Sequence, residues 1–355
     1  MSQPRALVYA QDPGGANLIA PIVTALLERV PREAVVVYHP LAEAAFRRAG
    51  LAAEPVAAHL ASLSADDAAI DAWLARVAPS HVICSASSRH VDLTNARLIA
   101  GARRRGVPSL TFLDHWVGFD RFTDESGAPA YLPDVTGVPD RYCQDRVVAL
   151  GAEPVRVPIV GHAHLERLAG RPAPVLSPGA AARLLLVSQP VVSDHSFRGA
   201  LFLDDRGERA IDRIASALSP LVAAGRLRVA YRAHPKERGG EPLPDGVAAD
   251  TGEGGAALLD RFDIFAGVTS MVLFEAAVAR RAVVQLDVPA LRAAVSGDWP
   301  PYDAGARVTS IDCLRAAAEA ALVNLHTGQR PAGVPGLALE GSLERSVALC
   351  ESFLS

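Results

Sequence analysis

Residues 6–29 read ALVYAQDPGGANLIAPIVTALLER and contain, in order, an apolar run, a glycine-containing turn and a helical pattern. Ala6–Tyr9 is apolar throughout, which is typical of a strand buried on both faces of a parallel sheet. Leu18–Arg29 has the composition and apolar spacing of a helix. A strand, a tight turn and a helix in this order predict the first part of a β-α-β unit.

The same alternation continues along the chain and predicts an α/β fold with parallel sheets. In the first half, we expect further strands at Ala34–Tyr38, His81–Cys84, Ser109–Leu113, Val135–Val138 and Val155–Val160, and further helices at Leu41–Ala49, Asp66–Val77, Asn95–Arg105 and Gln144–Leu150. In the second half, we expect strands at Leu184–Ser188, Leu227–Arg232, Ile264–Ala266 and Ala282–Leu286, and helices at Arg209–Ala223, Met271–Arg280, Ile311–Leu325 and Leu343–Leu354.

A segment rich in proline and glycine separates two domains. Residues 170–179 read GRPAPVLSPG, which can continue neither a helix nor a strand. We therefore expect a Rossmann-like domain at 1–169, a linker at 170–182, a second Rossmann-like domain at 183–340, and a C-terminal helix at 341–355 that packs back on the first domain. Two doubly wound domains of this kind face a cleft, and their ligands bind outside the carboxyl ends of the strands.

The composition is that of a folded protein without a strong affinity for polyanions. The 355 residues are 50% hydrophobic and 21% charged, with a formal net charge of -4. This charge gives no basic field that would attract nucleic acid or anionic lipid. No apolar run reaches the roughly 20 residues of a membrane span. The four cysteines form no C-x-x-C pair and no secretory leader is visible, so we expect a cytoplasmic protein with reduced thiols.

Two loops of the first domain carry candidate catalytic and acceptor-binding residues. In the loop after the first strand, Asp12 could act as a general base, while Gly14, Gly15 and Asn17 could bring the main chain and an amide close to a ligand. The alternative is a tight turn in which Asp12 caps the helix. In the loop after Ser109–Leu113, Asp114 or His115 could be the base and Trp116 could contact an acceptor; the alternative is a buried aromatic plug.

Two loops of the second domain suggest a phosphate site that needs no metal. Arg232, His234 and Lys236, the only lysine in the chain, alternate after a strand and would point to one side if the backbone is extended. Thr269 and Ser270 precede an apolar helix, whose N-terminal N–H groups can hold a phosphate. Glu275, in that helix, could reach a ribose diol. Solvated charges and a plain helix cap are the alternatives.

Ser188 and Gln189 follow the first strand of the second domain, where they could contact a base or a phosphate. His162 and His164 have a spacing compatible with a metal, but no third ligand with zinc-type spacing is present, so we expect no metal site. The chain contains neither G-x-G-x-x-G nor a P-loop nor a G-x-S-x-G elbow. These absences argue against a dinucleotide-binding fingerprint, a P-loop kinase and a serine hydrolase.

The order of these motifs resembles the GT-B glycosyltransferase superfamily, which includes the hydrolysing UDP-N-acetylglucosamine 2-epimerases. Residues 10–22, AQDPGGANLIAPI, resemble the first loop and helix of the epimerases but depart from their Arg-Pro-Glu core. His234-Pro235 together with Thr269-Ser270 is similar to the His-Pro and Ser/Thr motifs of bacterial sialyltransferases, polysialyltransferases and CDP-glycerol polymerising enzymes. The epimerases' second-domain His-Arg-X-Glu-Asn motif is missing, and Ser188-Gln189-Pro190 occupies its place.

The resemblance implies a GT-B fold and a set of roles for the candidate residues. The nucleotide half of a donor would be bound by Arg232, His234, Lys236, Thr269, Ser270 and Glu275. Asp12, or else Asp114 or His115, would take the proton of the acceptor. The implied activity is that of an inverting, metal-independent glycosyltransferase that uses a nucleotide sugar such as a UDP or CMP donor, needs no other cofactor, and acts on a hydroxyl of a glycan or natural product.

Three other functions remain open at this point. The first is a hydrolysing UDP-sugar 2-epimerase, and the second is a phosphotransferase that moves a polyol phosphate from a CDP donor. The third is a non-catalytic protein that binds a nucleotide sugar. The motif order favours a transferase over an epimerase because the second-domain epimerase motif is missing.

Overall fold

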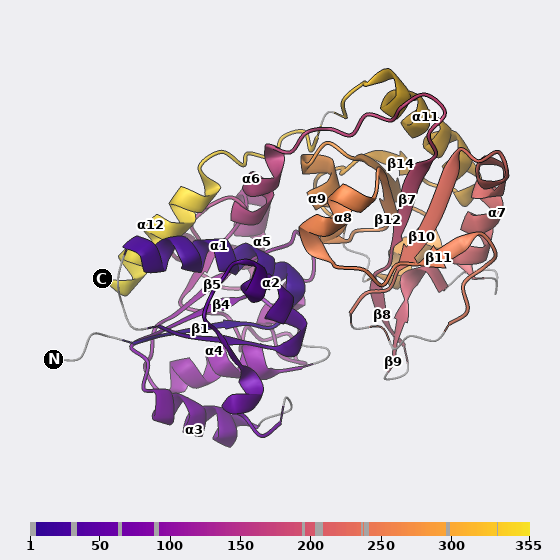
Figure 1. The fold of residues 1–355 in the computed structure, drawn as a ribbon. Coiled ribbons are helices and arrows are strands. Elements are labelled where there is room, and N and C mark those ends of the chain that lie inside the picture. Colours follow the sequence, from indigo (N-terminus) through magenta and orange to yellow (C-terminus); the bar gives the residue numbers. More distant parts are fainter. Residues whose placement is uncertain are drawn as a thin grey trace. The chain divides into compact units, whose positions relative to one another are not determined.

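The computed structural model describes residues 5–29, 34–62, 66–88, 92–193, 196–202, 209–235, 237, 241–295, 299–331 and 333–355. The chain divides into two compact units. Unit 1 comprises Met1–Arg167 and Ala338–Ser355, and unit 2 comprises Leu168–Leu337. Each unit is built around its own parallel sheet (Figure 1). The predicted fold class, two doubly wound Rossmann-like domains, is therefore confirmed.

The sheet of unit 1 has six strands in the order β3-β2-β1-β4-β5-β6, and all neighbours are parallel. This is the strand order of the Rossmann fold, which reverses between its first and fourth strands. Loops after β1 and β4 therefore lie on either side of the reversal point. The strands are β1 (Ala6–Ala10), β2 (Ala34–Tyr38), β3 (Glu54–Pro55), β4 (His81–Ser85), β5 (Ser109–Phe112) and β6 (Val135–Gly137).

Helices cover both faces of this sheet (Figure 1). One buried apolar cluster joins the strands to α1 (Pro13–Arg29), α2 (Glu43–Arg48) and α12 (Ser342–Leu354). A second cluster joins them to α3 (Asp67–Val77) and α4 (Thr94–Arg104). Unit 1 also contains α5 (Arg141–Ala149) and most of α6 (Ala163–Ala169), since the division between the units falls after Arg167. Because both faces are covered, the neighbouring strands β1 and β2 are apolar along their whole length, as the sequence indicated.

Unit 2 repeats the same strand order, β11-β10-β7-β12-β13-β14, again with parallel neighbours. Its order reverses between β7 and β12. The strands are β7 (Ala182–Val187), β10 (Leu227–Arg232), β11 (Val247–Ala249), β12 (Ile264–Gly267), β13 (Ala282–Leu286) and β14 (Ala306–Val308). An antiparallel pair, β8 (Pro190–Ser193) and β9 (Ser196–Gly199), follows β7.

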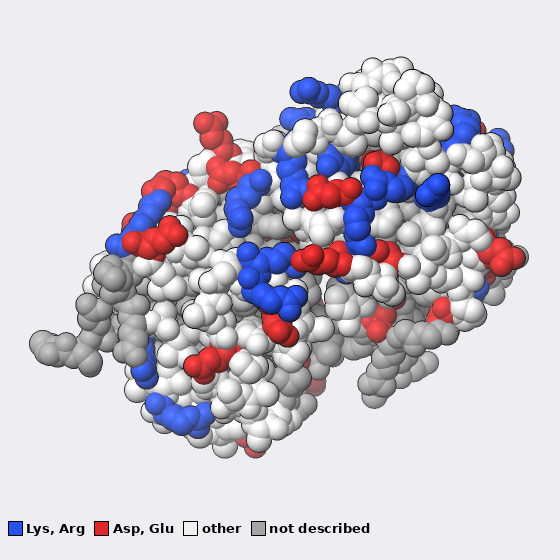
Figure 2. Space-filling model, viewed as in Figure 1, with Lys and Arg blue, Asp and Glu red and all other residues white. Residues whose placement is uncertain are grey.

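The helices of unit 2 are α7 (Ala210–Ala223), α8 (Leu258–Arg261), α9 (Met271–Val278), α10 (Pro289–Ala294) and α11 (Leu314–Thr327). Side chains of α7 and α11 form one large apolar core with the sheet. Basic and acidic side chains are interspersed over the face of the molecule shown in Figure 2. Among the described helices, none has both the length and the apolar composition needed to cross a membrane.

Two expectations about local structure were wrong. Val155–Val160 is not a strand: Pro154–Arg156 forms a 3₁₀ turn, and only an isolated bridge links Ile159 to Val138. Pro154 and Pro158 lack the N–H that a ladder needs. The first helix begins at Pro13 rather than Leu18, because proline suits the first helical position and the Asp12 carbonyl accepts the first helical hydrogen bond, from Ala16, at 2.9 Å.

The C-terminal helix α12 belongs to unit 1, where it lies beside α1 (Figure 1). Its N-cap residue, Gly341, has no side chain that could cap it. Glu166, in α6, supplies the cap instead: its carboxylate accepts hydrogen bonds from the main-chain N–H groups of Gly341 at 2.5 Å and Leu343 at 2.7 Å. A carboxylate at a helix N-terminus also interacts favourably with the helix dipole.

We therefore predict that Glu166→Ala lowers the free energy of unfolding of the chain by about 1–2 kcal/mol, because two N–H groups lose their acceptor. Denaturant unfolding measures this. Glu340→Ala is the matched control, since Glu340 is exposed and contributes only its carbonyl, to Arg345. An equal loss of stability in both variants would contradict the capping role of Glu166.

Candidate functional site

Gly14 and Gly15 lie in the first turn of α1, where each leaves room for a residue at the end of a strand. A Cβ atom on Gly14 would lie 2.5 Å from Oδ2 of Asp114, and one on Gly15 would lie 2.5 Å from Cβ of Ser85. Ser85 ends β4, and Asp114 follows β5. The two glycines thus let these strand ends approach the N-terminus of α1, where N–H groups favour a carboxylate.

Asp114 is buried, and both its side chain and its main chain are held in place. Arg121 donates from Nη1 to Asp114 Oδ1 at 3.0 Å and to the carbonyl of Ala86 at 3.1 Å, and from Nε to the carbonyl of Gly118 at 2.8 Å. His162 donates from Nε2 to the carbonyl of Asp114 at 3.1 Å. Arg121 therefore fixes this carboxylate and ties the loops after β4 and β5 together.

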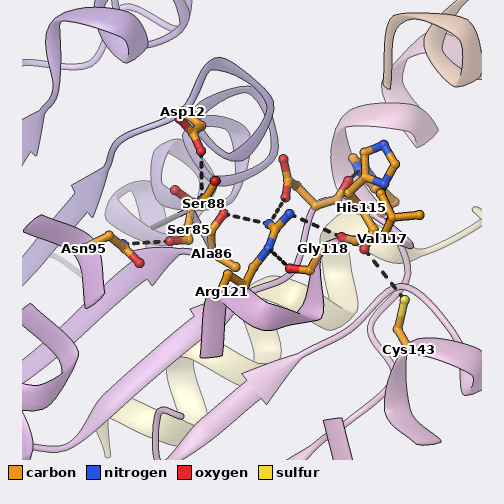
Figure 3. A network of polar contacts seen from close by, with 12 residues as sticks. Asp12, Ser85, Ala86, Ser88, Asn95, His115, Val117, Gly118, Arg121 and Cys143 are labelled. Carbon is orange, nitrogen blue, oxygen red and sulfur yellow. Dashed lines mark hydrogen bonds and ion pairs between the residues drawn. The ribbon is translucent and has the colours of Figure 1, made fainter. Parts of the chain in front are cut away.

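Asp12 and His115, the other two candidate bases, differ in what they offer a ligand. Asp12 is half-buried, and its Oδ2 accepts a hydrogen bond from the N–H of Ser88, across the reversal point of the sheet, at 3.1 Å (Figure 3). Nδ1 of His115 accepts from the N–H of Val117 at 3.2 Å. A neutral His115 therefore carries its proton on Nε2 and presents a donor, whereas Asp12 presents an acceptor.

The two remaining first-domain candidates are occupied by contacts within unit 1. Trp116 is fully buried, and its Nε1 donates to Oδ2 of Asp140 at 2.5 Å. Its ring stacks on His162 with 6.3 Å between ring centroids. Trp116 is thus a core residue in this structure. Asn17 is half-buried and accepts a hydrogen bond from Nη2 of Arg48 at 3.0 Å.

A buried polar cluster beside Asp12 was not predicted from the sequence. Nε2 of His39 lies 3.3 Å from Oδ2 of Asp92, and both side chains are buried. Gln11 donates from Nε2 to the carbonyl of Asp92 at 3.0 Å and accepts from the N–H of Asn95 at 3.1 Å. Gln11 and His39 directly follow β1 and β2, so the rule that ligands bind after strands could have identified them.

In unit 2, Gln189 connects the two loops that flank the reversal point. Its Oε1 accepts hydrogen bonds from N–H of Thr269 at 3.0 Å and from Oγ1 of Thr269 at 2.8 Å. The next residue, Ser270, is the N-cap of α9, and its Oγ accepts from the N–H of Val272 at 3.4 Å. Ser188, Gln189, Thr269 and Ser270 are thereby brought together at the carboxyl edge of the sheet, beside the positive end of α9.

The loop after β10 lies on the other side of β7. The N–H of His234 donates to Oε1 of Glu237 at 3.1 Å, and the hydroxyl of Tyr231 donates to Oε2 of Glu237 at 2.8 Å. Burial raises the pKa of Tyr231, so it acts as a hydroxyl donor. His234 is half-buried. Lys236 lies outside the described residues.

Neither Arg232 nor Glu275 is simply exposed at the edge of the sheet. Arg232 forms an ion pair, and Glu275 is buried. Arg232 donates from Nη1 to Oδ2 of Asp250 at 2.6 Å and to the carbonyl of Gly252 at 2.9 Å. Arg261 binds the same carboxylate at 2.8 Å. Burial raises the pKa of Asp250, but the hydrogen bonds from the two arginines outweigh it and the pKa is lowered. Glu275 is buried within α9, with 3% of its surface exposed.

Within the described ranges, no group of three or more histidine, cysteine, aspartate or glutamate side chains is arranged to hold a metal ion. The polar groups at the two sheet edges are hydroxyls, amides, imidazoles, separate carboxylates and ion-paired arginines. Such groups bind anions and sugar hydroxyls through hydrogen bonds and charge.

We predict that Arg121→Gln lowers the free energy of unfolding by about 3 kcal/mol, because it leaves the Asp114 carboxylate buried without its partner. The double variant Arg121→Gln, Asp114→Asn should lose less than the sum of the single variants, which a double-mutant cycle in denaturant measures. Arg141→Gln breaks an exposed pair with Asp145 and should cost about 0.5 kcal/mol or less. Additive losses at 114 and 121 would contradict the coupling.

Comparison with known proteins gives structural matches only. No family model matches the sequence, and neither does any curated protein. A UDP-GlcNAc 2-epimerase from Methanocaldococcus jannaschii, solved with UDP-GlcNAc and UDP, is similar with a TM-score of 0.64 at 12% identity, covering 98% of this chain and 99% of the other. The Neisseria meningitidis UDP-GlcNAc 2-epimerase bound to UDP-GlcNAc has a TM-score of 0.63 at 10% identity, covering 99% of each chain.

The glycosyltransferase of kitacinnamycin is also similar, with a TM-score of 0.55 at 17% identity over 100% of both chains. At these identities the likeness concerns the fold. The matches extend over both sheets and include epimerases as well as glycosyltransferases. The chain therefore has the GT-B fold, with two Rossmann-like domains that each contain a six-stranded parallel sheet.

Proposed function

We propose that the protein is an inverting, metal-independent glycosyltransferase that moves a sugar from a nucleotide-sugar donor to a hydroxyl of a glycan or natural product. The supporting observation is the carboxyl edge of unit 2, where Gln189, His234 and Ser270 follow three adjacent strands. Ligands of doubly wound sheets bind at this edge, beside the point at which the strand order reverses.

The donor phosphates would bind at the N-terminus of α9. Ser270 caps this helix, and the first N–H groups of a helix have no partners within it. His234 would add a donor from the neighbouring loop, and Lys236 a positive charge. As the bond between the anomeric carbon and the phosphate oxygen breaks, negative charge grows on the leaving phosphate. Donors already aimed at it stabilise that charge without reorganisation.

The acceptor would bind unit 1, with Asp12 as the general base. Asp12 follows β1 at the reversal point, is half-buried, and is a carboxylate that can accept the proton of the attacking hydroxyl. Asp114 is less suited to this role because Arg121 already binds its carboxylate. His115 is less suited because its Nδ1 is already an acceptor. Gly14 and Gly15 would shape the site indirectly, because the space beside them is filled by Asp114 and Ser85.

Hydrolytic 2-epimerisation of a UDP sugar is the second candidate. It is favoured by the higher TM-scores of the epimerase structures, 0.64 and 0.63 against 0.55 for the glycosyltransferase of kitacinnamycin. The solved complexes with UDP-GlcNAc make UDP sugars the first donors to test for either activity.

We predict that a UDP sugar at 100 times its Kd stabilises the chain by about 2.7 kcal/mol in a thermal-shift assay.

His234→Ala should lower turnover by about a hundredfold or more, because it removes a donor to the leaving phosphate. His326→Ala, on the exposed side of α11, is the control. If His234→Ala turns over nearly as fast as wild type, His234 has no role in the mechanism.

Asp12→Asn should retain donor binding and lose turnover by a factor of about 10² to 10⁴. Transfer should persist in the presence of a metal chelator.

Deuterium incorporation at C2 of the sugar from heavy water, with no acceptor present, would identify the epimerase instead. Donor binding without turnover over a broad acceptor panel would identify a non-catalytic binding protein.

A further inference from the structure

A cationic cavity lies within unit 2, away from the proposed donor site. It has a volume of about 560 Å³ and is lined by three arginines, Arg171, Arg280 and Arg330, together with small residues and prolines. Among the described residues, none that lines it is acidic. A volume of this size matches a small-molecule ligand.

The cavity lies at the amino-terminal edge of the sheet. Arg280 is in the turn between α9 and β13, so it precedes a strand, whereas Ser188, His234 and Ser270 follow strands. β13 has five residues, which places the two edges roughly 16 Å apart. The cavity is therefore a site separate from that proposed for the donor.

Positive charge around the cavity exceeds negative charge. Arg171 is paired with Asp260 at 2.8 Å, but no carboxylate of the described residues pairs with Arg280, Arg281 or Arg330. The buried Arg281 donates only to carbonyls, those of Leu259 at 2.7 Å, Pro172 at 2.6 Å and Ala279 at 3.0 Å. Figure 2 shows basic side chains gathered over the region of α8 and α9, with acidic ones between them.

Burial lowers the pKa of the Arg281 guanidinium, and the nearby carboxylates of Asp260 and Asp263 oppose this effect. Arg280 and Arg330 have no such acidic partner among the described residues, so an anion in the cavity would supply one. Guanidinium groups match phosphate and carboxylate oxygens with two parallel hydrogen bonds, and phosphate carries more charge.

The backbone at Arg280 is a second, independent feature of the cavity. Arg280 has a φ of +60°, and Ala78 is the only other non-glycine residue with positive φ in the described part of the chain. Its N–H bonds the carbonyl of Ala277 at 3.0 Å, and that of Arg281 bonds Ala276 at 2.8 Å. These two bonds form a Schellman motif, in which the position of Arg280 is usually glycine. Arginine thus occupies a position where its backbone is disfavoured, and its guanidinium lines the cavity.

Contacts on the far side hold that guanidinium in place. Nη1 of Arg280 donates to the carbonyl of Pro331 at 3.0 Å. A Cβ on Gly333 would lie 3.0 Å from the same nitrogen, so the glycine leaves room for it. Pro331 and Arg330 belong to the segment after α11, and Arg171 and Pro172 belong to the linker after α6. Both segments lie near the points where the chain passes between the units, at 167/168 and 337/338.

We propose that this cavity binds a small multivalent anion with phosphate groups, held by Arg171, Arg280 and Arg330. The bound anion connects the linker to the segment after α11. These are the two segments through which the chain passes from one unit to the other. The cavity is a regulatory site rather than part of the donor site. This inference does not depend on the proposed function, because it concerns the opposite edge of the sheet.

The test is a thermal-shift and calorimetric titration with pyrophosphate and inorganic phosphate, at constant ionic strength with chloride as the reference. We expect pyrophosphate to raise the Tm of the whole chain and to bind more tightly than phosphate. Arg280→Gln with Arg330→Gln should weaken this binding about tenfold or more. His234→Ala should leave the pyrophosphate binding that depends on Arg280 and Arg330 unchanged and weaken only binding at the proposed donor site, which separates the two sites.

The variant Arg280→Gly distinguishes a loss of anion binding from a loss of folding. Glycine suits the backbone at this position, so the variant should be at least as stable as wild type without ligand, and it should bind pyrophosphate more weakly. Arg315→Gln, at the opposite end of α11, is the control for general loss of charge. Pyrophosphate binding of equal affinity in wild type and in the Arg280 and Arg330 variants, or no binding in wild type, would overturn the proposal.

Discussion

In each unit, a glutamine side chain bridges the point at which the strand order of the sheet reverses. Gln11 follows β1 and bonds the segment after β4, at Asp92 and Asn95. Gln189 follows β7 and bonds Thr269, after β12. A parallel sheet leaves a crevice at this point, because the loops on its two sides turn away from each other. The glutamines give N–H groups of Asn95 and Thr269 an acceptor there, and they connect the loops on the two sides of each reversal point.

The sequence was sufficient to predict the sheets because burial on both faces makes central strands apolar throughout. It was not sufficient for the edge strands β3, β11 and β14, which have only two or three residues each. The prediction of a strand at Val155–Val160 was wrong for the opposite reason. Its apolar residues suggested a strand, but Val155 and Ile159 are exposed, and two prolines prevent continuous pairing.

For the candidate site, the sequence indicated the loops but not the residues that hold them. Asp12 and Ser270 could be identified because they follow strands and precede helices. The partners of Asp114 could not be assigned, since Arg121 is one polar residue among several in its loop, and His162 lies 48 positions away. A local sequence pattern reflects the conformational preferences of the backbone. A buried ion pair depends instead on which strands become neighbours in the sheet.

A bound anion can change the behaviour of the two units only through a difference in affinity between their arrangements. The start of the linker is already fixed on unit 2, because Arg281 holds the carbonyl of Pro172 and Arg171 is paired with Asp260. The segment after α11 is held to the rest of unit 2 by the bond from Arg280 to Pro331. An anion bound by Arg330 would hold this segment as well, and the segment leads back to α12, whose N-terminus Glu166 caps in unit 1. A regulatory effect on unit 1 would therefore act through Arg330 and this return of the chain.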